Sequence, residues 1–300
     1  MFFSLSRIFP LFGCICTLFL LGCSPFTEPG SGLGSGFGSD FGKSSGSFRV
    51  YFLDVGQGDA CLLRTPANHF FLYDIGNEER YLLSFLRHVK ADTLDGVFIS
   101  HPELDHFGAF QALYREIPIK KVYLPVGTSS DPTWQDVLRT LDAFKGGKGT
   151  LFAGDTLIWD GAVHVRALWP YSRASFTGNN LSVVLRVEYA SHAVLLTGDV
   201  ENQGETGMLA AGSHLGSDIL KVAHHGSRTS NGLPFLSAVA PKWAVISCDS
   251  TVYGHPHPEA VADLKFILGD STRILRTDRV GTIAFDIDAN GIRRLTENEF

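Results

Sequence analysis

Residues 101–106 read His-Pro-Glu-Leu-Asp-His and combine two imidazoles with two carboxylates. Both groups bind divalent cations, and the segment follows a short apolar run, Val97–Ile99, where a loop at the end of a strand can turn side chains toward one point. Adjacent carboxylates repel each other and burial raises their pKa, so a cation among them would offset the cost of this clustering. A solvated, histidine-rich polar loop is the alternative interpretation, because short motifs also arise by chance.

Candidate ligands also follow other strand-like runs: Asp74, Asp199, the pair His224 and His225, and His255. In an α/β sheet, side chains at the carboxyl ends of strands converge on one crevice. Taken singly, the two aspartates could be turn residues beside glycine, and the histidines could cap a helix or lie in a surface turn. Their repetition at strand ends favours a shared metal site.

The pattern of apolar residues from about residue 48 onward predicts an α/β fold in which two mixed β-sheets are sandwiched between helical layers, as one domain. We predict strands at 50–55, 60–64, 69–74, up to 100, 120–124, 157–159, 163–168, 181–188, 193–197, 219–223 and 243–247, and a terminal hairpin at 273–287. Helices are predicted at 78–88, 107–116, 132–144, 202–211, 230–239 and 258–268.

The overall charge of the chain limits its partners. A length of 300 residues supports one sizeable α/β domain, and the net charge of −6 provides no general basic surface. Non-specific binding of nucleic acid through the overall field is therefore not expected.

The N-terminal residues are predicted to direct the chain to the cell envelope. Residues 1–22 resemble a signal peptide that ends in Leu-Leu-Gly before Cys23, a lipobox-like sequence in which the cysteine is acylated. Residues 23–47 are rich in Gly and Ser and are predicted to be a flexible tether to a domain at 48–300. An ordinary secretory peptide or an uncleaved anchor is the alternative; we predict no membrane span after Cys23. Inner and outer membrane are not distinguished.

Six segments together resemble the metallo-β-lactamase superfamily, and within it the branch typified by the C-terminal domain of the ComEC/Rec2 competence proteins. They are residues 52–60, 73–77, 101–106, 195–199, 220–227 and 253–256, in the family's order within residues 48–288. The resemblance implies an αββα sandwich with a one- or two-metal site at the shared edge of the sheets. Full-length members of this branch carry a multi-span membrane channel, which this chain is not predicted to contain, so no role in DNA import is predicted.

The resemblance also implies roles by position. His101, Asp105 and His106 correspond to ligands of the signature loop, Asp199 to a carboxylate that bridges two ions, and His255 with one of His224 or His225 to late histidines. Asp54, Asp59 and Asp74 correspond to acids that orient the ligands.

Two positions depart from the family pattern. Glu103 stands where the superfamily has histidine and the competence branch has aspartate, and Gly-Asn-Asn at 178–180 replaces a later ligand histidine, with Asn180 as the expected ligand. Because oxygen replaces imidazole nitrogen at both positions, the preference shifts from zinc toward manganese or magnesium. We expect one or two divalent ions, Zn or Mn, and if Glu103 does not reach the site one ion is expected to bind loosely or not at all.

The resulting expectation is a lipid-anchored, metal-dependent hydrolase, best described as a phosphodiesterase or nuclease that uses a metal-activated water, with DNA or another phosphodiester as substrate. Asp105 would orient the nucleophile, and His224 or His225 would protonate the leaving oxygen or hold the phosphate. Lys221, Arg228 and Arg276 are candidates for positive charge near the crevice, although each could equally be a solvated surface charge.

Two alternatives remain open. One is a hydrolase that attacks a carbonyl in a lactone, β-lactam or thioester, since a fold does not specify a substrate. The other is a metal-poor binding module that displays nucleic acid or a partner on the same fold.

Overall fold

The computed structural model describes residues 46–172 and 177–300. The predicted signal peptide, Cys23 and all of the tether except Gly46 and Ser47 lie outside the described residues. Among the residues that are described, no helix has both the length and the apolar character needed to cross a membrane.

The first sheet has eight strands in the order β15-β14-β1-β2-β3-β4-β5-β6. Its pairings are antiparallel from β15 to β3 and parallel from β3 to β6. The strands are β1 (Phe48–Phe52), β2 (Ala60–Arg64), β3 (Phe70–Ile75), β4 (Gly96–Phe98), β5 (Lys121–Tyr123), β6 (Gly147–Gly149), β14 (Ile283–Asp288) and β15 (Gly291–Leu295).

The second sheet has seven strands in the order β13-β12-β11-β10-β9-β8-β7. Strands β10 to β13 are parallel, and β7 to β10 pair antiparallel. The strands are β7 (Thr156–Trp159), β8 (Val163–Trp169), β9 (Val184–Tyr189), β10 (His192–Leu196), β11 (Ile219–Lys221), β12 (Trp243–Ile246) and β13 (Ile274–Arg276).

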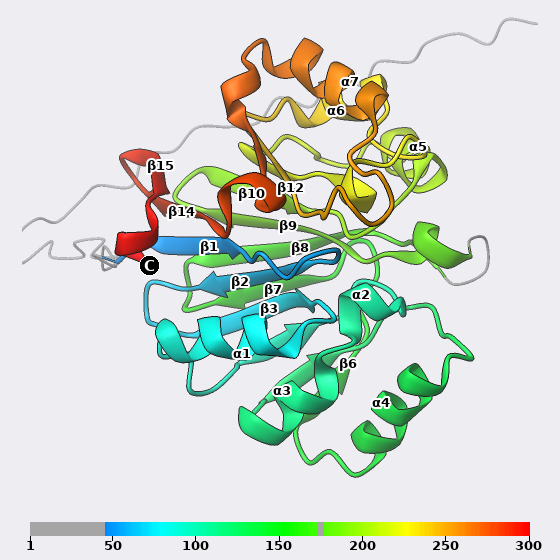
Figure 1. The fold of residues 1–300 in the computed structure, drawn as a ribbon, viewed down its shortest axis with the longest axis vertical. Helices are drawn as coiled ribbons and strands as arrows, with labels where there is room; N and C mark the ends of the chain where they lie inside the picture. The colour runs from blue at the N-terminus through cyan, green and yellow to red at the C-terminus, as the bar shows by residue number, and fades with distance from the viewer. Residues whose placement is uncertain (1–45, 173–176) are drawn as a thin grey trace, which may run out of the picture. The chain divides into compact units, whose positions relative to one another are not determined.

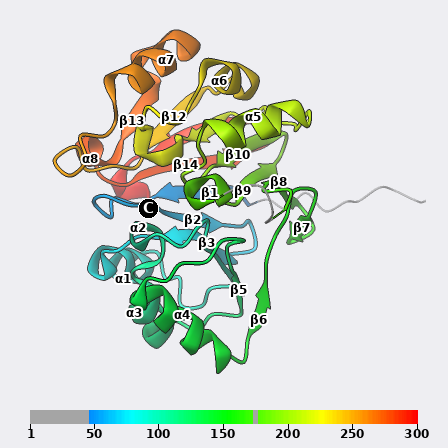
Figure 2. The same ribbon diagram turned by 90° about the vertical axis from the view of Figure 1, so that its right-hand side faces the viewer.

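Helices cover the outer face of each sheet (Figures 1 and 2). The first sheet carries α1 (Glu79–His88), α3 (Phe110–Glu116) and α4 (Pro132–Asp142), and the second carries α5 (Asn202–Ala210), α6 (Leu233–Val239) and α7 (Pro258–Leu268). Short helices α2 (Leu104–Phe107) and α8 (Thr277–Val280) and single 3₁₀ turns, among them Gly178–Leu181 and Ala223–Gly226, lie in the connections. The predicted fold, two mixed sheets flanked by helices, is confirmed.

Three apolar clusters separate these four layers. Alternate residues of facing strands, for example Phe52, Leu185 and Phe285, fill the space between the sheets. Helix α1 illustrates the outer layers: Leu82 and Leu86, one turn apart, are both fully buried against the first sheet. Each sheet is therefore buried on both faces, and each outer helix buries one face against its sheet.

Two strands, β6 and β15, were not predicted, and two predicted elements differ from the observed ones in more than their bounds. The terminal hairpin at 273–287 is wrong, because residues 274–276 pair with β12 in the second sheet, and the chain then crosses to the first sheet, where β14 and β15 form the hairpin. The predicted helix 107–116 is two helices, and the first, α2, already begins at Leu104 inside the metal-ligand motif. Tertiary pairing and packing, rather than local pattern, decided both.

Candidate metal centre

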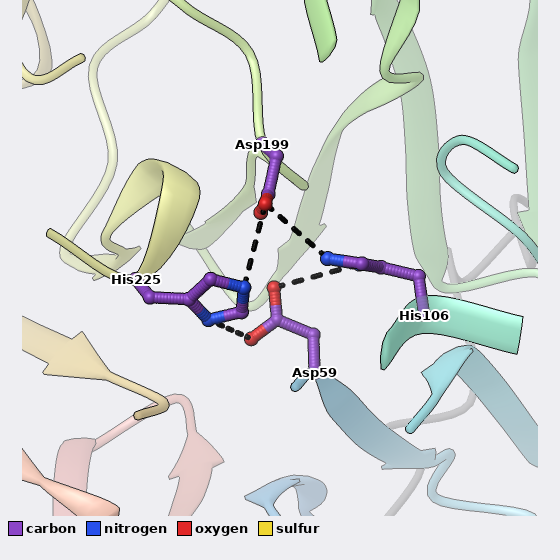
Figure 3. Close-up of side chains that lie close together, drawn as sticks. All are labelled: Asp59, His106, Asp199 and His225. Carbon is purple, nitrogen blue, oxygen red and sulfur yellow. Dashed lines mark ion pairs between the residues drawn. The ribbon is translucent and has the colours of Figure 1, made fainter. Parts of the chain in front are cut away.

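Four buried side chains from distant parts of the chain meet at one point (Figure 3). Asp59 precedes β2, His106 lies on α2, Asp199 follows β10, and His225 follows β11. One potential ligand atom of each lies within 4.8 Å of those of the others. The convergence follows from topology, because β10 and β11 are parallel neighbours and their carboxyl ends open at the same edge.

Asp199 lies at the middle of this group. Its Oδ2 is 3.3 Å from Nε2 of His106 and 3.4 Å from Nε2 of His225. Asp105 approaches the same two nitrogens, with Oδ2 3.3 Å from His225 Nε2 and Oδ1 3.9 Å from His106 Nε2. Two imidazoles and two carboxylates therefore surround a common point.

The second ring nitrogen, Nδ1, of His106 and of His225 has its own hydrogen-bond partner. His106 Nδ1 lies 2.9 Å from Asp74 Oδ2, and His225 Nδ1 donates to the carbonyl oxygen of Ser247 at 2.8 Å. A donor role for Nδ1 leaves Nε2 as the lone-pair nitrogen that a metal requires, which is the usual arrangement of ligating histidines. Asp74 thus lies where the sequence expects an acid that orients a ligand.

Asp59 lies on the same rear side. Its oxygens are 3.8 Å from Nδ1 of both His106 and His225, and it forms an ion pair with the buried Lys221. The Lys221 ammonium is also 3.8 Å from Asp199 Oδ1. Burial opposes the charge of Lys221, but the nearby carboxylates of Asp59 and Asp199 outweigh it and raise its pKa. Lys221 therefore adds positive charge beneath the centre and has almost no surface to offer a substrate.

Unpaired buried atoms test whether a cation fits here. Nε2 of His101, His106 and His225 and Oδ1 of Asp199 are buried and have no hydrogen-bond partner. His101 Nδ1 is hydrogen-bonded to Ser100 Oγ at 3.0 Å, and its ring centroid lies 4.2 Å from that of His106. An unpaired buried polar atom costs about 1–3 kcal/mol, and several of them around one point are stable only with a shared partner. Nitrogen and carboxylate donors in this number fit a divalent cation.

The electrostatics of the protein alone point the same way. Burial disfavours the imidazolium form of His225, but Asp199 and Asp59 outweigh it and raise its pKa to about 10. Burial likewise opposes the charge of His106, but Asp199, Asp105 and Asp74 raise its pKa well above the usual range. Burial likewise raises the pKa of Asp105, but His106 and His225 dominate and lower it to about 2. The carboxylates thus demand positive charge between them, which protons or a metal can supply.

The candidate ligands on the open side are held less firmly. The carboxylate of Glu103 lies 3.9 Å from His101 Nε2, and its side chain is 51% exposed. His224 Nε2 lies 3.9 Å from Asp199 Oδ2 and 3.4 Å from the amide nitrogen of Asn179. Glu103, Asn179 and His224 form what we call the open half of the centre, and Asp59, His106, Asp199, Lys221 and His225 its buried half.

Asn180, the expected replacement ligand, has its side chain engaged elsewhere. Its amide nitrogen donates to Glu201 at 3.0 Å, and its amide oxygen accepts from the backbone of Gly204 on α5 at 3.0 Å. Its neighbour Asn179 has the free group, a buried amide oxygen without a hydrogen-bond partner beside His224. The structure therefore brings Asn179, which sequence reasoning did not choose, closer to the ligand role.

The remaining predicted residues lie around this centre. His255 stacks on His225 at a centroid distance of 6.2 Å, outside the group of four. Arg276 is paired with Asp278, its Nε 2.9 Å from Oδ1, whereas Arg228 is exposed on the segment after His225. Asp54 lies near Asp249 and Asp278, and in the described parts of the chain it has no hydrogen bond or ion pair with the site histidines.

The turn that carries His224 and His225 is strained, with φ of 50° and 53°. Asn231 holds it: its side chain accepts from Ala223 N at 3.0 Å and donates to Ala223 O at 2.9 Å. Buried Glu205 in turn accepts from Asn231 N at 2.5 Å and from Gly232 N at 3.0 Å. Sequence reasoning missed both residues, since Asn-Gly at this position indicates only a turn.

Gly58 permits the close approach of the loop that carries Asp59. Its φ is +142°, and a Cβ there would lie 2.5 Å from the carbonyl oxygen of Asp105. The same contact lets Asp59 N donate to Asp105 O at 3.1 Å. A side chain at position 58 would push apart two loops that meet at the centre.

Comparisons with known proteins agree with this geometry. The profile of the Metallo-beta-lactamase superfamily matches residues 53–250. "ComE operon protein 3" of Bacillus subtilis (strain 168) is 31% identical over 257 residues, which cover 79% of this chain and 32% of that protein. "Competence protein ComA" of Neisseria gonorrhoeae is 33% identical over 245 residues, 80% of this chain and 32% of that protein. The chain thus spans about a third of the length of these relatives.

One solved structure illustrates the fold. CmlA, a diiron β-hydroxylase from Streptomyces venezuelae, superposes with a TM-score of 0.53 and 17% identity, covering 83% of this chain and 54% of that chain. At this identity the likeness concerns the fold alone.

Proposed function

The chain belongs to the metallo-β-lactamase superfamily, and from that premise we propose that it is a metal-dependent hydrolase of phosphodiesters, held at the cell envelope by a lipid on Cys23. The coarser part of this statement, a metal-dependent hydrolase, is supported by the fold together with the buried Asp/His cluster. The substrate class, the metal and the anchor are the proposal.

One observation carries it: the buried, unpaired Nε2 atoms of His106 and His225 both lie within 3.4 Å of the Asp199 carboxylate, and His101, whose Nε2 is also unpaired, lies beside His106. Such a cluster is costly to fold without a cation. Bound divalent ions would supply Lewis-acid activation of a water and of the phosphoryl group.

The protein's own side chains would then divide the work. Asp74 and the Ser247 carbonyl keep the lone pairs of His106 and His225 directed inward. Asp105, with a pKa of about 2, is ionised at neutral pH, and its partly exposed carboxylate can accept a hydrogen bond from the attacking water. His224, partly exposed beside Asp199, can donate to the leaving oxygen. Zn and Mn both fit this mixture of imidazole and carboxylate donors.

The preference for phosphodiesters rests on the relatives, one of which is named a competence protein. DNA is therefore the first substrate to test. A lactone, β-lactam or thioester hydrolase would use the same centre on a carbonyl, and a binding module would need no metal.

The test is hydrolysis by the purified protein, loaded with Mn or Zn, of single-stranded DNA, bis(p-nitrophenyl) phosphate, nitrocefin and a lactone. We expect turnover of the phosphodiesters, loss of turnover in Asp199→Asn, and no change in Asp136→Asn, a matched substitution at an exposed carboxylate on α4. Faster turnover of nitrocefin or the lactone would move the proposal to carbonyl chemistry. Absence of bound metal under every loading condition would favour the binding module.

The lipid anchor has its own test. Metabolic labelling with a fatty-acid analogue should mark the full chain and leave Cys23→Ala unlabelled, with the variant released from the membrane fraction. Labelling that survives the substitution would argue against acylation at Cys23.

A further inference from the structure

A groove of about 610 Å³ opens beside the metal centre. Its walls come from the loop between β1 and β2, the start of α1, the helix α2 and the loop between β12 and α7. The side chain of Asp105 lines it, and the same carboxylate lies 3.3 Å from Nε2 of His225. A group attached to a phosphate at the centre would therefore extend into this groove.

The walls of the groove present large apolar surfaces to solvent. Tyr81 is 62% exposed, Tyr253 69%, Val252 51% and Leu104 41%. These four come from three separate elements, yet all line the same groove. Apolar side chains gathered around a concave surface mark a binding site for a ring or another apolar group.

The charge of the groove excludes an anionic occupant. Its eleven lining residues include the carboxylates of Glu78, Asp105 and Asp249 and no lysine or arginine. A smaller adjoining cavity adds Asp54 and Asp278. The nearby guanidinium of Arg276 is already paired with Asp278. Metal ions would neutralise the Asp105 end, but a second phosphate farther along would meet carboxylates only.

Hydrogen bonds hold the loops around the groove in place before any ligand enters. Gln57 accepts from the backbone of Asp249 at 3.1 Å and so ties the β1–β2 loop to the β12–α7 loop. The carboxylate of Asp249 accepts from Thr251 N at 2.9 Å and closes the turn that leads to Tyr253. The loops therefore need little ordering on binding, and the exposed rings of Tyr81 and Tyr253 are what a ligand would order.

We propose that this groove binds the uncharged ring of a terminal nucleoside attached to the scissile phosphate, by stacking on Tyr81 and Tyr253, and that it excludes a further phosphate. This inference rests on the proposed function and narrows it: a chain end or a dinucleotide fits, whereas an internal stretch of a polynucleotide does not. Base stacking on an aromatic side chain contributes roughly 5- to 150-fold in binding.

The experiment compares four substrates of the metal-loaded full chain. They are thymidylyl-thymidine (TpT), the two isomeric abasic analogues in which one or the other base of TpT is missing, and TpT with an added terminal phosphate. We expect loss of one of the two bases, the one in the groove, to raise KM about 10-fold or more, and loss of the other to change KM little. A terminal phosphate on the nucleoside that occupies the groove should raise KM similarly. Glu78→Lys should make this increase in KM smaller.

Substitution of the two tyrosines tests whether the walls of the groove cause these changes in KM. Tyr81→Ala and Tyr253→Ala should raise KM for TpT but not for the isomer that lacks the groove base. Tyr171→Ala, a matched change at a half-exposed tyrosine that lines a different cavity, should alter neither. Equal KM values of the wild type for TpT and both abasic isomers would overturn the inference while leaving the hydrolase intact.

A binding measurement separates this inference from the proposed function. Equilibrium dialysis with the methylphosphonate analogue of TpT reports on the groove without any turnover. Binding that Tyr81→Ala and Tyr253→Ala both weaken supports the groove even if no phosphodiester is hydrolysed. No binding to the wild type overturns it.

Discussion

On its buried side the metal centre is formed by side chains with almost no exposure, whereas on its open side the candidate ligands are partly exposed. His106, Asp199 and His225 are at most 1% exposed as residues, and His106 and His225 each have a second contact that fixes their orientation. Glu103, by contrast, is half exposed as a side chain and lies 3.9 Å from His101. The same sequence motif thus contributes to both halves, one fixed by the core and one dependent on loops.

The difference has a consequence for metal binding. A ligand that is held in place before the ion arrives loses little entropy on binding, whereas an exposed side chain must be ordered. If two ions bind, we therefore expect the ion between His106, Asp199 and His225 to bind more tightly than the one beside His101 and Glu103.

The largest effect is expected for Asp199→Asn, because Asp199 belongs to the buried half and also lies 3.9 Å from His224 of the open half. Loss of its charge should remove bound metal and lower kcat/KM by about 10³-fold or more, the equivalent of several kcal/mol of charge stabilisation. Steady-state kinetics and elemental analysis of the same sample measure both. A variant that retains its metal and most of its rate would contradict the central place of Asp199.

Lys221→Met tests whether the ammonium group of Lys221 stabilises the folded protein by compensating the buried carboxylate of Asp59. The change leaves Asp59 buried without its cation and should lower the free energy of unfolding by about 3–5 kcal/mol. Chemical denaturation measures it, and Lys242→Met, which breaks an exposed pair with Asp218, should cost no more than about 1 kcal/mol. Adding Asp59→Asn to Lys221→Met should recover part of the loss; no recovery would place the effect in packing instead.

Glu205, which accepts a hydrogen bond from Asn231 behind the turn of His225, should make the stability of the fold depend on pH. Burial raises its pKa from 4.5 to about 7, so between these values the folded protein retains a proton that the unfolded chain has released. Stability should therefore fall as pH rises from about 4.5 to 7, by an amount of the order of 3 kcal/mol, and be flat above. Denaturation of the metal-free protein across this range, compared with Glu205→Gln, isolates the contribution; parallel profiles would refute it.

The smallest effect is expected on the open side. Glu103→Gln should weaken only one of the two ions, roughly 10-fold, and leave the other unchanged. Metal titration followed by calorimetry resolves the two binding steps. Equal weakening of both ions would mean that the two halves act as one unit.

Much of the site could be predicted because its ligands lie in short motifs at strand ends. The segment 101–106, Asp199 and the pair at 224–225 each follow an apolar strand, and parallel strands bring their ends to one edge. The sequence could not decide between His224 and His225, because the left-handed turn that separates their directions is held by Asn231. It named Asn180 as the ligand, whereas in the structure the Asn180 amide is engaged by Gly204 and the amide of Asn179 lies beside His224.

The signal peptide, the acylated Cys23 and the tether remain predictions, since they fall outside the described residues apart from Gly46 and Ser47.

Among the charged residues expected near a substrate, tertiary structure separated three cases. Lys221 is buried under the centre, Arg276 is paired with Asp278, and Arg228 alone is exposed. Residue type gave no means of telling these apart, because pairing depends on residues far away along the chain.

By itself, the sequence determined the layers of the fold, the order of the strands that carry ligands, and the chemistry of those ligands. These follow from local periodicity and from residue type, which do not depend on distant contacts. Only the tertiary structure decided which nitrogen faces inward, which lysine compensates the buried acids, and where the tyrosines of the groove meet. Those outcomes depend on side chains from separate elements sharing one small volume, and close packing, not local pattern, selects among the alternatives.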